Sequence, residues 1–377
     1  MSRPRILLVT HFYPTHRGGV EIGAGKVAGL LAKRDYKVTW AASDSDSPPT
    51  GCAEMTFLPM QANNAIEAKL GIPFPLWSRR ALNQLRNAIT DADLVHIHES
   101  LYQGNGVAAR AAMRLGIPYL VTQHIGFIPY KNPLLRMILT FANKLVAMPI
   151  LKRASGISFV SETTQRYFQG LGLPSAAGEL IPMGVDTEIF TPDGPADRAS
   201  LGFSDDQPLC IFVGRFVEKK GLPIIRQLAE ANPAIQWALV GHGPIDPNEW
   251  KLRNVKVFGG LSGATLAPVY RAADLFVMPS VGEGYPAVVQ EAMACGTPVL
   301  ISTETAEGYT PAQPYLHSVP AANLAEWTKT TMNLLSDTAA LSAASPTLAS
   351  FARTHWSLDA CVARYEDLIK KSMGRTA

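Results

Sequence analysis

One stretch of the sequence, from Ala273 to Ser302, constrains the fold more than any other. Its pattern predicts a buried strand, a glycine-rich loop, a helix and the start of another strand, over residues 275–279, 280–285, 286–294 and 299–302. Pro286 is typical of a helix start and Gly296 of a helix end. This order of elements builds a concave site at the carboxyl edge of a parallel sheet, where the first N–H groups of the helix are unpaired. Such a site favours a phosphate or a sugar hydroxyl.

Two glutamates frame the glycine-rich loop. Glu283 lies in the loop and Glu291 lies inside the predicted helix, with seven residues between them. On a period of about 3.6 residues per turn, both carboxylates can face one cleft and hold two parts of one ligand. The alternative is that Glu283 only complements the helix N-terminus and that Glu291 is a solvated helix residue. A ligand is favoured by the small residues that let backbone come close to it: Gly282, Gly284, Ala292, Ala294 and Gly296.

The segment EGYPAVVQEAMACGTPV resembles the signature of the family-four retaining glycosyltransferases. The resemblance implies an α/β fold of GT-B architecture, in which two Rossmann-like domains face each other across an interdomain cleft. It also implies that Glu283 acts in catalysis by holding sugar hydroxyls, and that Glu291 binds the ribose hydroxyls of a nucleotide diphosphate sugar. Gly284, Tyr285 and Pro286 are expected to complete this part of the donor site.

The first domain, on the acceptor side, is expected to span residues 1–185. A strand over 6–10 is followed by a loop and by a helix that starts near Val20. Gly18 and Gly19 lie at the entrance of this helix, where backbone N–H groups can contact a diphosphate, and they resemble the N-terminal glycine loop of the family. The nearby run GAGKVAG is not a dinucleotide fingerprint, because its glycines fall inside the helical pattern.

His124 follows a strand predicted over 118–122 and lies at the edge where the two domains would face each other. A histidine in such a place is ordinarily a capped core imidazole. The resemblance instead implies that His124 contacts the donor sugar and takes part in catalysis.

Three groups of residues raise the question of a metal site. His96 and His98 share one face of a predicted strand, and they are expected to line a cleft because no third ligand is evident. Two acidic pairs lie in turn-rich or strand-entrance segments and are not expected to bind a metal: Asp44 with Asp46, and Asp91 with Asp93.

The second domain, residues 186–355, opens in the same way as the first. A segment rich in Pro, Gly and Asp marks the boundary, and a strand over 209–213 leads into GRFVEKKGL. Arg215 supplies a planar fork of donors and Lys220 a point charge, a combination that suits a diphosphate. Together with Gly214 they match the diphosphate-binding loop of the family. Gly259 matches the place where backbone groups contact the base, and the last helix, 356–373, is expected to return to the first domain.

Charge and apolar patterning suggest where the chain works. Residues 1–185 carry a net charge of +8 and residues 186–377 one of −5, so the first half suits an anionic partner. Four scattered cysteines indicate a reducing cytoplasm. The most apolar stretch, 133–151, contains Arg136, Asn143 and Lys144 and is not expected to span a membrane. Basic and apolar residues interleave there and over 70–86. Two interpretations of this pattern are open: contact with an anionic membrane surface, or a buried helix with polar ends.

The sequence therefore predicts a cytoplasmic, metal-independent hexosyltransferase that retains the anomeric configuration. Its acceptor is expected to be a carbohydrate or a lipid-linked sugar, in polysaccharide, lipopolysaccharide or glycolipid assembly, and no nucleic acid partner is expected. One alternative is an inverting GT-B transferase, whose general base would be Glu21, Glu99 or His11. The others are a nucleotide-sugar epimerase and a non-catalytic module that binds sugar nucleotides.

Overall fold

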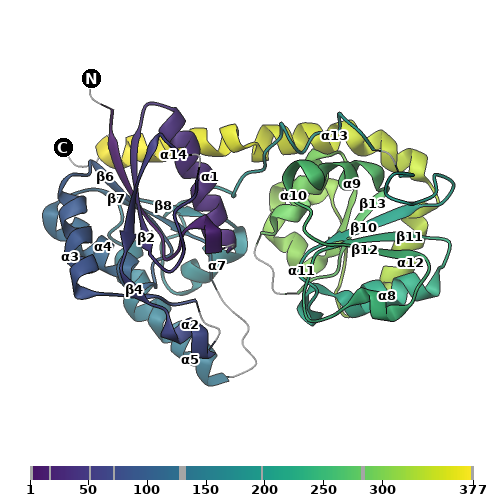
Figure 1. Cartoon of the computed structure of the whole chain (residues 1–377), viewed down its shortest axis with the longest axis horizontal. Coiled ribbons are helices and arrows are strands. Elements are labelled where there is room, and N and C mark those ends of the chain that lie inside the picture. Colours follow the sequence, from purple (N-terminus) through teal and green to yellow (C-terminus); the bar gives the residue numbers. More distant parts are fainter. Residues whose placement is uncertain are drawn as a thin grey trace. The chain divides into compact units, whose positions relative to one another are not determined.

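A computed structural model describes residues 3–16, 18–50, 52–70, 73–126, 133–196, 198–281 and 285–374. The chain forms two compact units, Met1–Pro182 with Cys361–Ala377, and Met183–Ala360. Each unit has one parallel sheet with helices on both of its faces (Figure 1). The predicted α/β class, with two Rossmann-like units, is confirmed. The boundary predicted after residue 185 lies three residues beyond Pro182.

The sheet of the first unit has seven strands in the order β3-β2-β1-β6-β7-β8-β9. Their bounds are β1 (Arg5–Val9), β2 (Lys37–Ser43), β3 (Met55–Met60), β6 (Leu94–His98), β7 (Tyr119–Gln123), β8 (Gly156–Phe159) and β9 (Glu179–Leu180). Alternate residues of a strand point to opposite faces. Leu7 and Val9 therefore join one apolar core and Ile6 and Leu8 the other, so both faces of the sheet are buried.

Helices cover both faces of this sheet. They are α1 (Gly19–Lys33), α2 (Ala65–Leu70), α3 (Arg79–Thr90), α4 (Gln103–Leu115), α5 (Pro133–Ala142), α6 (Met148–Leu151) and α7 (Glu162–Gly170), with a small ribbon of β4 (Ala62–Asn63) and β5 (Leu76–Trp77). The last helix, α14 (Leu358–Gly374), adds Val362, Tyr365 and Ile369 to the core beneath α1. It is fixed there by an ion pair between Arg34 and Glu366 at 2.5 Å.

The sheet of the second unit has six strands in the order β12-β11-β10-β13-β14-β15. They are β10 (Leu209–Val213), β11 (Gln236–Val240), β12 (Val255–Phe258), β13 (Leu275–Met278), β14 (Val299–Ser302) and β15 (His317–Val319). The helices are α8 (Leu222–Ala231), α9 (Ala267–Ala272), α10 (Ala287–Ala294), α11 (Thr303–Ala306), α12 (Leu324–Leu335) and α13 (Thr338–Trp356). The helix predicted over 286–294 is α10, whose N-cap is Pro286.

In each sheet the direction of winding reverses beside the first strand. The chain passes from β1 outward to β2 and β3 and then returns to place β6 on the other side, and it passes from β10 to β11 and β12 before it places β13. Loops that leave two such neighbouring strands diverge, and the crevice between them at the carboxyl edge is where parallel α/β sheets bind ligands. The two topological switch points, β1/β6 and β10/β13, therefore fix where to look for a site.

One continuous helical run, Pro133–Leu151, is long and apolar enough by length and composition to cross a membrane. It consists of α5, a π-helical turn η2 (Asn143–Ala147) and α6. This differs from the expectation that Arg136, Asn143 and Lys144 interrupt the apolar run. Only the end of this run lies in the core of the first unit, where Met148, Ile150 and Leu151 of α6 are buried.

Candidate functional site

The loop that leaves β10 is held against the loop that leaves β11. Gly241 has a φ of +153°, and a Cβ atom there would lie 1.9 Å from the carbonyl oxygen of Gly214. Only glycine fits such a close approach of two backbones. The N–H of Phe216 donates to the carbonyl of His242 at 2.8 Å, and the Phe216 ring is buried. With Phe216 anchored inward, the neighbouring Arg215 side chain is exposed.

The same loop is also tied to the exit of β13, across the switch point. The N–H of Val281 donates to the carbonyl oxygen of Lys219 at 2.9 Å. Gly221 has a φ of +79°, and a Cβ atom there would come within 2.4 Å of the carbonyl oxygen of Pro279. The half-buried Lys220 lies between these two anchor points in the chain. The structure thus brings the predicted cationic loop and the start of the predicted glycine-rich loop together at one sheet edge.

Aromatic rings fix the far end of the glycine-rich loop. Tyr285 stacks on Tyr309 with ring centroids 4.0 Å apart, and Trp356 packs edge-on against both rings. The hydroxyl of Tyr309 donates to the carbonyl of Pro286 at 2.6 Å. No side chain among the described residues caps the start of α10 at Pro286, so its first N–H groups suit an anion. Glu283 and Gly284 lie outside the described residues.

Glu291 lies on α10 and is half-buried, not a solvated helix residue. One of its carboxylate oxygens accepts a hydrogen bond of 3.1 Å from the hydroxyl of Tyr270, on α9. Burial, and then the charge of Glu291, raise the pKa of Tyr270 well above its ordinary value, so this hydroxyl remains a donor. Gly259 is further away along the edge, beyond the end of β12, and the space around its α-carbon is open.

In the first unit, Gly18 is the N-cap of α1 and Gly19 is its first residue. A Cβ atom on Gly18 would lie 2.0 Å from a carboxylate oxygen of Glu21, whereas nothing lies within 4 Å of one on Gly19. The buried Glu21 is paired with His11 at 2.7 Å. Position 18 therefore has to be glycine, because the Glu21 side chain folds back toward the helix start and occupies the space that a Cβ atom would need. The sequence alone does not indicate this constraint.

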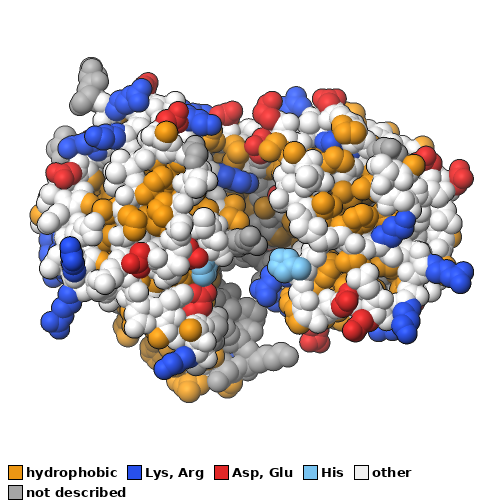
Figure 2. Space-filling view, viewed as in Figure 1, with side chains coloured by type: hydrophobic (Ala, Val, Ile, Leu, Met, Phe, Trp, Pro, Cys, Tyr) orange, Lys and Arg blue, Asp and Glu red, His pale blue; other side chains and the backbone are white. Residues whose placement is uncertain are grey.

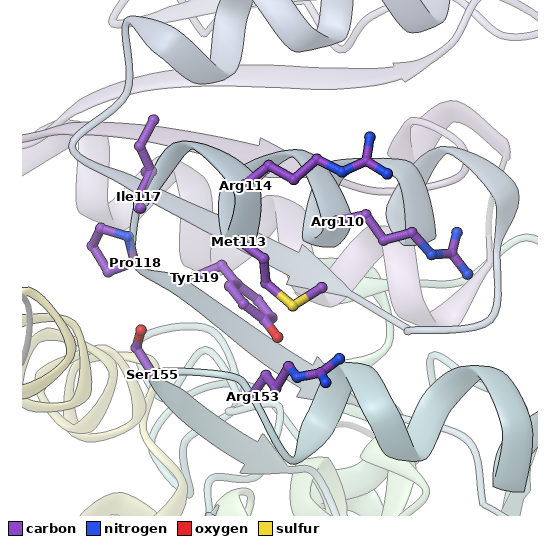
Figure 3. A pocket seen from close by; sticks show the side chains of 9 residues that line it. Arg110, Met113, Arg114, Ile117, Pro118, Tyr119, Arg153 and Ser155 are labelled. Atoms are coloured by element: carbon purple, nitrogen blue, oxygen red, sulfur yellow. The ribbon is translucent and has the colours of Figure 1, made fainter.

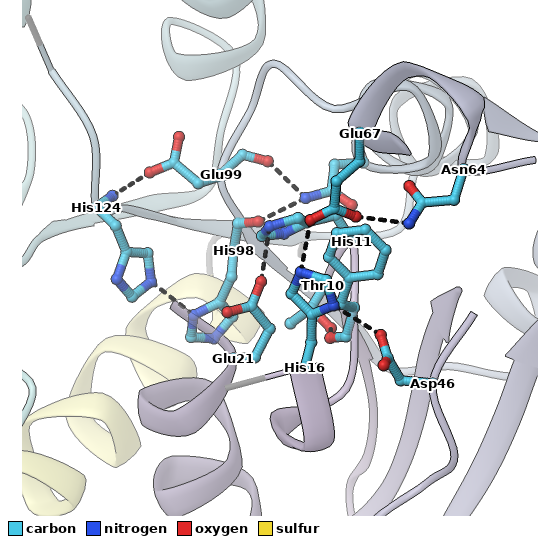
Figure 4. A network of polar contacts seen from close by, with 12 residues as sticks. Thr10, His11, His16, Glu21, Asp46, Asn64, Glu67, His98, Glu99 and His124 are labelled. Carbon is cyan, nitrogen blue, oxygen red and sulfur yellow. Dashed lines mark hydrogen bonds and ion pairs between the residues drawn. The ribbon is translucent and has the colours of Figure 1, made fainter. Parts of the chain in front are cut away.

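His124 follows β7 and is held by two residues that end β6 (Figure 4). Its Nε2 atom lies 2.9 Å from Nδ1 of His98. Its backbone N–H donates to Oε1 of Glu99 at 2.5 Å, and the N–H of Ile125 donates to the same oxygen at 2.6 Å. The amide of Gln123 donates to the other carboxylate oxygen of Glu99 at 2.6 Å. Ring and backbone of His124 are thus both fixed.

Glu99 adopts a backbone conformation that is uncommon for a residue other than glycine. Its φ is +71°. Residues in sparsely populated backbone regions cost of order 1–3 kcal/mol and cluster at functional sites, where the surroundings over-determine them. Asn105 helps to hold Glu99 in this conformation, because its amide donates to the carbonyl oxygens of His98 at 2.5 Å and of Glu99 at 2.7 Å. The β6 exit is therefore shaped so that one carboxylate can bind the β7 exit.

Burial keeps the histidines at this edge neutral. It lowers the pKa of His96 and of His124 to about 3, and the pKa of His98 well below 6.5, with the neighbouring imidazoles acting in the same direction. Burial also raises the pKa of Glu99 to about 8, although three N–H donors oppose the shift. His124 is therefore neutral and offers a ligand no positive charge. Because its Nε2 atom already contacts His98, the nitrogen it offers to a ligand is Nδ1.

The sequence analysis placed His96 and His98 on one face, and their ring centroids are 4.4 Å apart. The expectation that they line a cleft is wrong, because their exposed fractions are 0% and 1%. Both are buried, and His98 contacts His124. A signal for this arrangement is present in the sequence, because His98 and Glu99 lie at the end of one buried strand and His124 at the end of the next strand of the sheet.

Three residues of the acidic pairs have partners within the first unit. Asp44 accepts the N–H of Ala62 at 2.9 Å, and Asp46 lies 2.8 Å from His16, whose other ring nitrogen is 3.0 Å from Glu67. Among the described residues no group of three or more His, Cys, Asp or Glu is placed to hold a metal ion. Asp93 pairs with Arg5 at 2.8 Å, which lowers the pKa of Asp93 and fixes the start of β6.

A depression of about 560 Å³ lies on the first unit, away from these residues (Figure 3). Arg110, Arg114 and Arg153 surround it, and Met113 and Tyr119 form its floor. It lies where chain segments enter β7 and β8, which is the amino edge of the sheet. None of the predicted site residues lines it, so size alone does not identify the functional site.

Comparison with known proteins adds two family matches. Residues 17–189 match the model described as Glycosyltransferase Family 4, and residues 207–337 match the model described as Glycosyl transferases group 1. The two models together cover most of both units.

Two relatives illustrate the sequence similarity. A GDP-mannose-dependent monoacylated alpha-(1-6)-phosphatidylinositol monomannoside mannosyltransferase from Corynebacterium glutamicum is 32% identical over 39% of this chain and 44% of its own. A D-inositol 3-phosphate glycosyltransferase from Mycobacteroides abscessus is 28% identical over 75% of this chain and 69% of its own. The chain thus matches less than half of the first relative's length and about two thirds of the second's.

Solved structures share the fold. Sucrose-phosphate synthase from Thermosynechococcus elongatus superimposes with a TM-score of 0.77 at 20% identity, over 99% of this chain and 100% of its own. Anabaena Alr3699/HepE, solved in complex with UDP, also has a TM-score of 0.77, at 16% identity, over 97% of this chain and 99% of its own. At these identities the likeness supports the architecture alone.

Proposed function

The chain belongs to the family-four glycosyltransferases of GT-B architecture, and on that premise we propose that it transfers a sugar from a nucleotide diphosphate sugar to an acceptor hydroxyl. The main observation behind the proposal is that backbone contacts join the loops that follow β10 and β13. The hydrogen bond from Val281 to Lys219 and the fit of Gly221 against Pro279 hold Lys220 beside the start of the glycine-rich loop. A cation and a helix N-terminus at one switch point are suited to a diphosphate.

The leaving diphosphate sets the main electrostatic demand. It gains negative charge as the glycosidic bond breaks, and groups fixed in advance at that position stabilise the transition state. Arg215, Lys220, the amides near Gly214 and the start of α10 at Pro286 supply such groups in the second unit. The amides of Gly18 and Gly19 are proposed to add to them from the first. These donors take the place of a metal ion, so the reaction is proposed to be metal-independent.

The remaining contacts divide the donor between its two ends. Glu291, oriented by Tyr270, is proposed to bind the ribose hydroxyls, and the backbone at Gly259 the base. Glu283 and Gly284 are proposed to hold the sugar, next to Tyr285. His124 is proposed to bind the sugar through the ring nitrogen that His98 leaves available. Its neutrality suits this role, because a hydroxyl can donate to or accept from a neutral imidazole.

We place the reaction in the retaining class, with front-face substitution. Among the described residues no side chain stands out as a covalent nucleophile, so the leaving phosphate oxygen is proposed to take the acceptor proton. The residues considered as bases for an inverting enzyme, His11, Glu21 and Glu99, are all buried in the first unit, which supports the retaining class. Analysis of the anomeric configuration of the product separates the two classes.

The acceptor is proposed to be a carbohydrate or a lipid-linked sugar. The named substrates of the two relatives, a phosphatidylinositol mannoside and an inositol phosphate, support a polyol or glycolipid acceptor. We accordingly place the protein in the cytoplasm, at the inner face of the membrane, in the assembly of a polysaccharide, a lipopolysaccharide or a glycolipid.

A thermal-shift screen of nucleoside diphosphates tests the proposal at its base. One of the uridine, guanosine or adenosine diphosphates should raise the unfolding temperature, with and without a chelator, because ligand that binds only the folded state stabilises it. The screen also identifies the base. If none of the three shifts the transition, or if the shift requires added Mn²⁺, the metal-independent donor site is wrong.

A further inference from the structure

The helix α5 and the adjoining turn η2 carry large apolar side chains on the outside of the first unit. Leu134, Met137, Ile138, Phe141 and Leu145 are 55%, 51%, 53%, 56% and 70% exposed. Successive members of this set lie one, three or four positions apart in the sequence, which places them along one face of a helix. We call these five residues the α5 stripe. No residue of α5 is buried, so its apolar composition is not explained by the core of its own unit.

The α5 stripe stands out from the rest of the described surface. Eleven large hydrophobic residues are exposed, and the stripe contains five of them. Figure 2 shows hydrophobic side chains gathered where α5 lies in Figure 1. Contiguous exposed apolar patches of this kind mark sites of protein or membrane interaction.

The charges around the stripe identify the partner. Residues 133–161 contain four basic residues and no acidic residue. Lys144, beside Leu145 in the turn η2, is exposed, and so are Lys152 and Arg153 at the end of α6. A helix with an apolar face and basic flanks binds in the interface of a bilayer that contains anionic lipids.

The second half of the same helical run explains why it would lie on a bilayer and not cross one. Asn143, Ala147, Met148, Ile150 and Leu151 are buried in the first unit. To span a membrane, these residues would have to leave the core that they help to form. The run is therefore anchored to the protein at one end and exposes apolar side chains at the other.

From these observations we propose that the α5 stripe inserts into the surface of an anionic bilayer, while Lys144, Lys152 and Arg153 face lipid phosphates. The inference deepens the proposed function, on which it rests for the presence of a membrane-linked acceptor. A stable protein interface uses about 20–30 residues a side, so five exposed side chains fit a bilayer better than a second copy of the chain.

Vesicle flotation of the full chain tests the inference. The protein should float with vesicles of phosphatidylcholine and phosphatidylglycerol at low salt, and much less with phosphatidylcholine alone or at high salt. Phe141→Ser with Leu145→Ser should lower the partition coefficient at least about tenfold, because two large side chains no longer enter the bilayer. Lys144→Ala should lower it by about fivefold, as expected from the loss of one basic residue near an anionic surface.

Leu115→Ser is the matched control. Leu115 is 49% exposed on α4 of the same unit and is not part of the stripe, so its replacement should leave flotation unchanged. The inference is overturned if wild type does not float, if the double variant floats equally well, or if wild type is a dimer that the double substitution dissociates. The thermal shift with nucleoside diphosphate is measured on the same samples. A shift without flotation rejects the membrane surface alone, and flotation without a shift rejects the proposed donor site alone.

Discussion

The N–H of Val281 donates to the carbonyl oxygen of Lys219 across 2.9 Å, and so joins the loops that leave two neighbouring strands on either side of a change in winding direction. Backbone groups make this bond, so it depends on the paths of the two loops and not on the identity of either side chain. Its consequence is that Lys220 belongs to the same piece of structure as the start of the glycine-rich loop.

Gly221→Ala should separate the two loops. The φ of +79° is unfavourable for alanine, and the new Cβ atom would lie 2.4 Å from the carbonyl oxygen of Pro279. Gly116→Ala is the control, because Gly116 has a φ of +68° and open space around it, on the first unit. Both variants should lose about 1–2 kcal/mol of stability from the backbone conformation. Only Gly221→Ala should also weaken nucleoside diphosphate binding, as measured by calorimetric titration; equal binding by both variants would show that the loop connection is not needed.

Glu291→Gln should weaken the preference of the protein for a nucleoside diphosphate that carries both ribose hydroxyls. The wild-type protein should bind a nucleoside diphosphate more tightly than its 2′-deoxy, 3′-deoxy analogue, and the variant should narrow the difference by about 1.5–3 kcal/mol, the contribution of a hydrogen bond to a charged group. Tyr270→Phe should narrow it less, because Tyr270 only orients the carboxylate. If the variant keeps the full preference for ribose, Glu291 does not contact it.

His98→Phe should lower turnover through His124. Loss of the 2.9 Å contact leaves Nε2 of His124 without its ring partner, and misplacement of a positioned group by about 1 Å can cost roughly 10²-fold in rate. Affinity for the nucleoside diphosphate should not change. His96→Phe is the matched control, since His96 is equally buried but contacts Thr122, at 2.8 Å. Steady-state kinetics of both variants decide the matter: a similar loss of turnover in each would indicate a general packing defect.

The stability of the first unit should fall in acid. His96 and His124 have pKa values of about 3 in the folded protein and His98 is lowered too, against an ordinary value of 6.5. The unfolded chain therefore binds more protons below pH 6.5, and the stabilisation from these groups is lost as the pH falls from 6.5 toward 3. Urea unfolding at a series of pH values measures this slope. A free energy of unfolding that does not change over this range would contradict the neutral histidines.

Glu99 acts in the opposite direction between pH 4.5 and about 8, a range that overlaps that of the histidines up to pH 6.5. Its folded pKa of about 8 lies above the ordinary 4.5, so its stabilising contribution is lost as the pH rises toward 8. In the same urea series, Glu99→Gln should abolish the decline between pH 6.5 and 8 and steepen the loss of stability between pH 6.5 and 4.5, where Glu99 offsets the histidines. Persistence of the alkaline decline in Glu99→Gln would assign that decline to another group.

The sequence predicted the elements of the central stretch because each has a local cause. Proline and glycine set the bounds of α10, and short buried runs set β13 and β14. The region after β15 is less regular and forms two helices. α12 ends at Leu335, and Asp337 caps α13 by accepting the N–H of Ala340 at 2.9 Å. The composition of this region gives no indication of where one helix ends and the next begins.

Contacts between elements were beyond the sequence. The fixation of His124 depends on β6 and β7 being neighbours in a register that pairs His98 with Thr122. The orientation of Glu291 depends on α9 placing Tyr270 beside α10. Exposure of the α5 stripe is likewise a tertiary fact, because periodicity identifies an apolar face but not what covers it. The roles assigned to Arg215, Lys220 and Glu283 remain predictions.

One titration tests the central claim most directly, namely that a diphosphate is bound where the loops after β10 and β13 meet. The nucleoside diphosphate selected by the thermal-shift screen and the corresponding nucleoside are titrated into wild type, Lys220→Ala and Lys219→Ala. Lys220→Ala should weaken diphosphate binding by about 1.5–3 kcal/mol and leave nucleoside binding unchanged, because only the phosphates meet the missing charge. The exposed Lys219 should be dispensable. Equal diphosphate affinity in all three proteins would contradict the account.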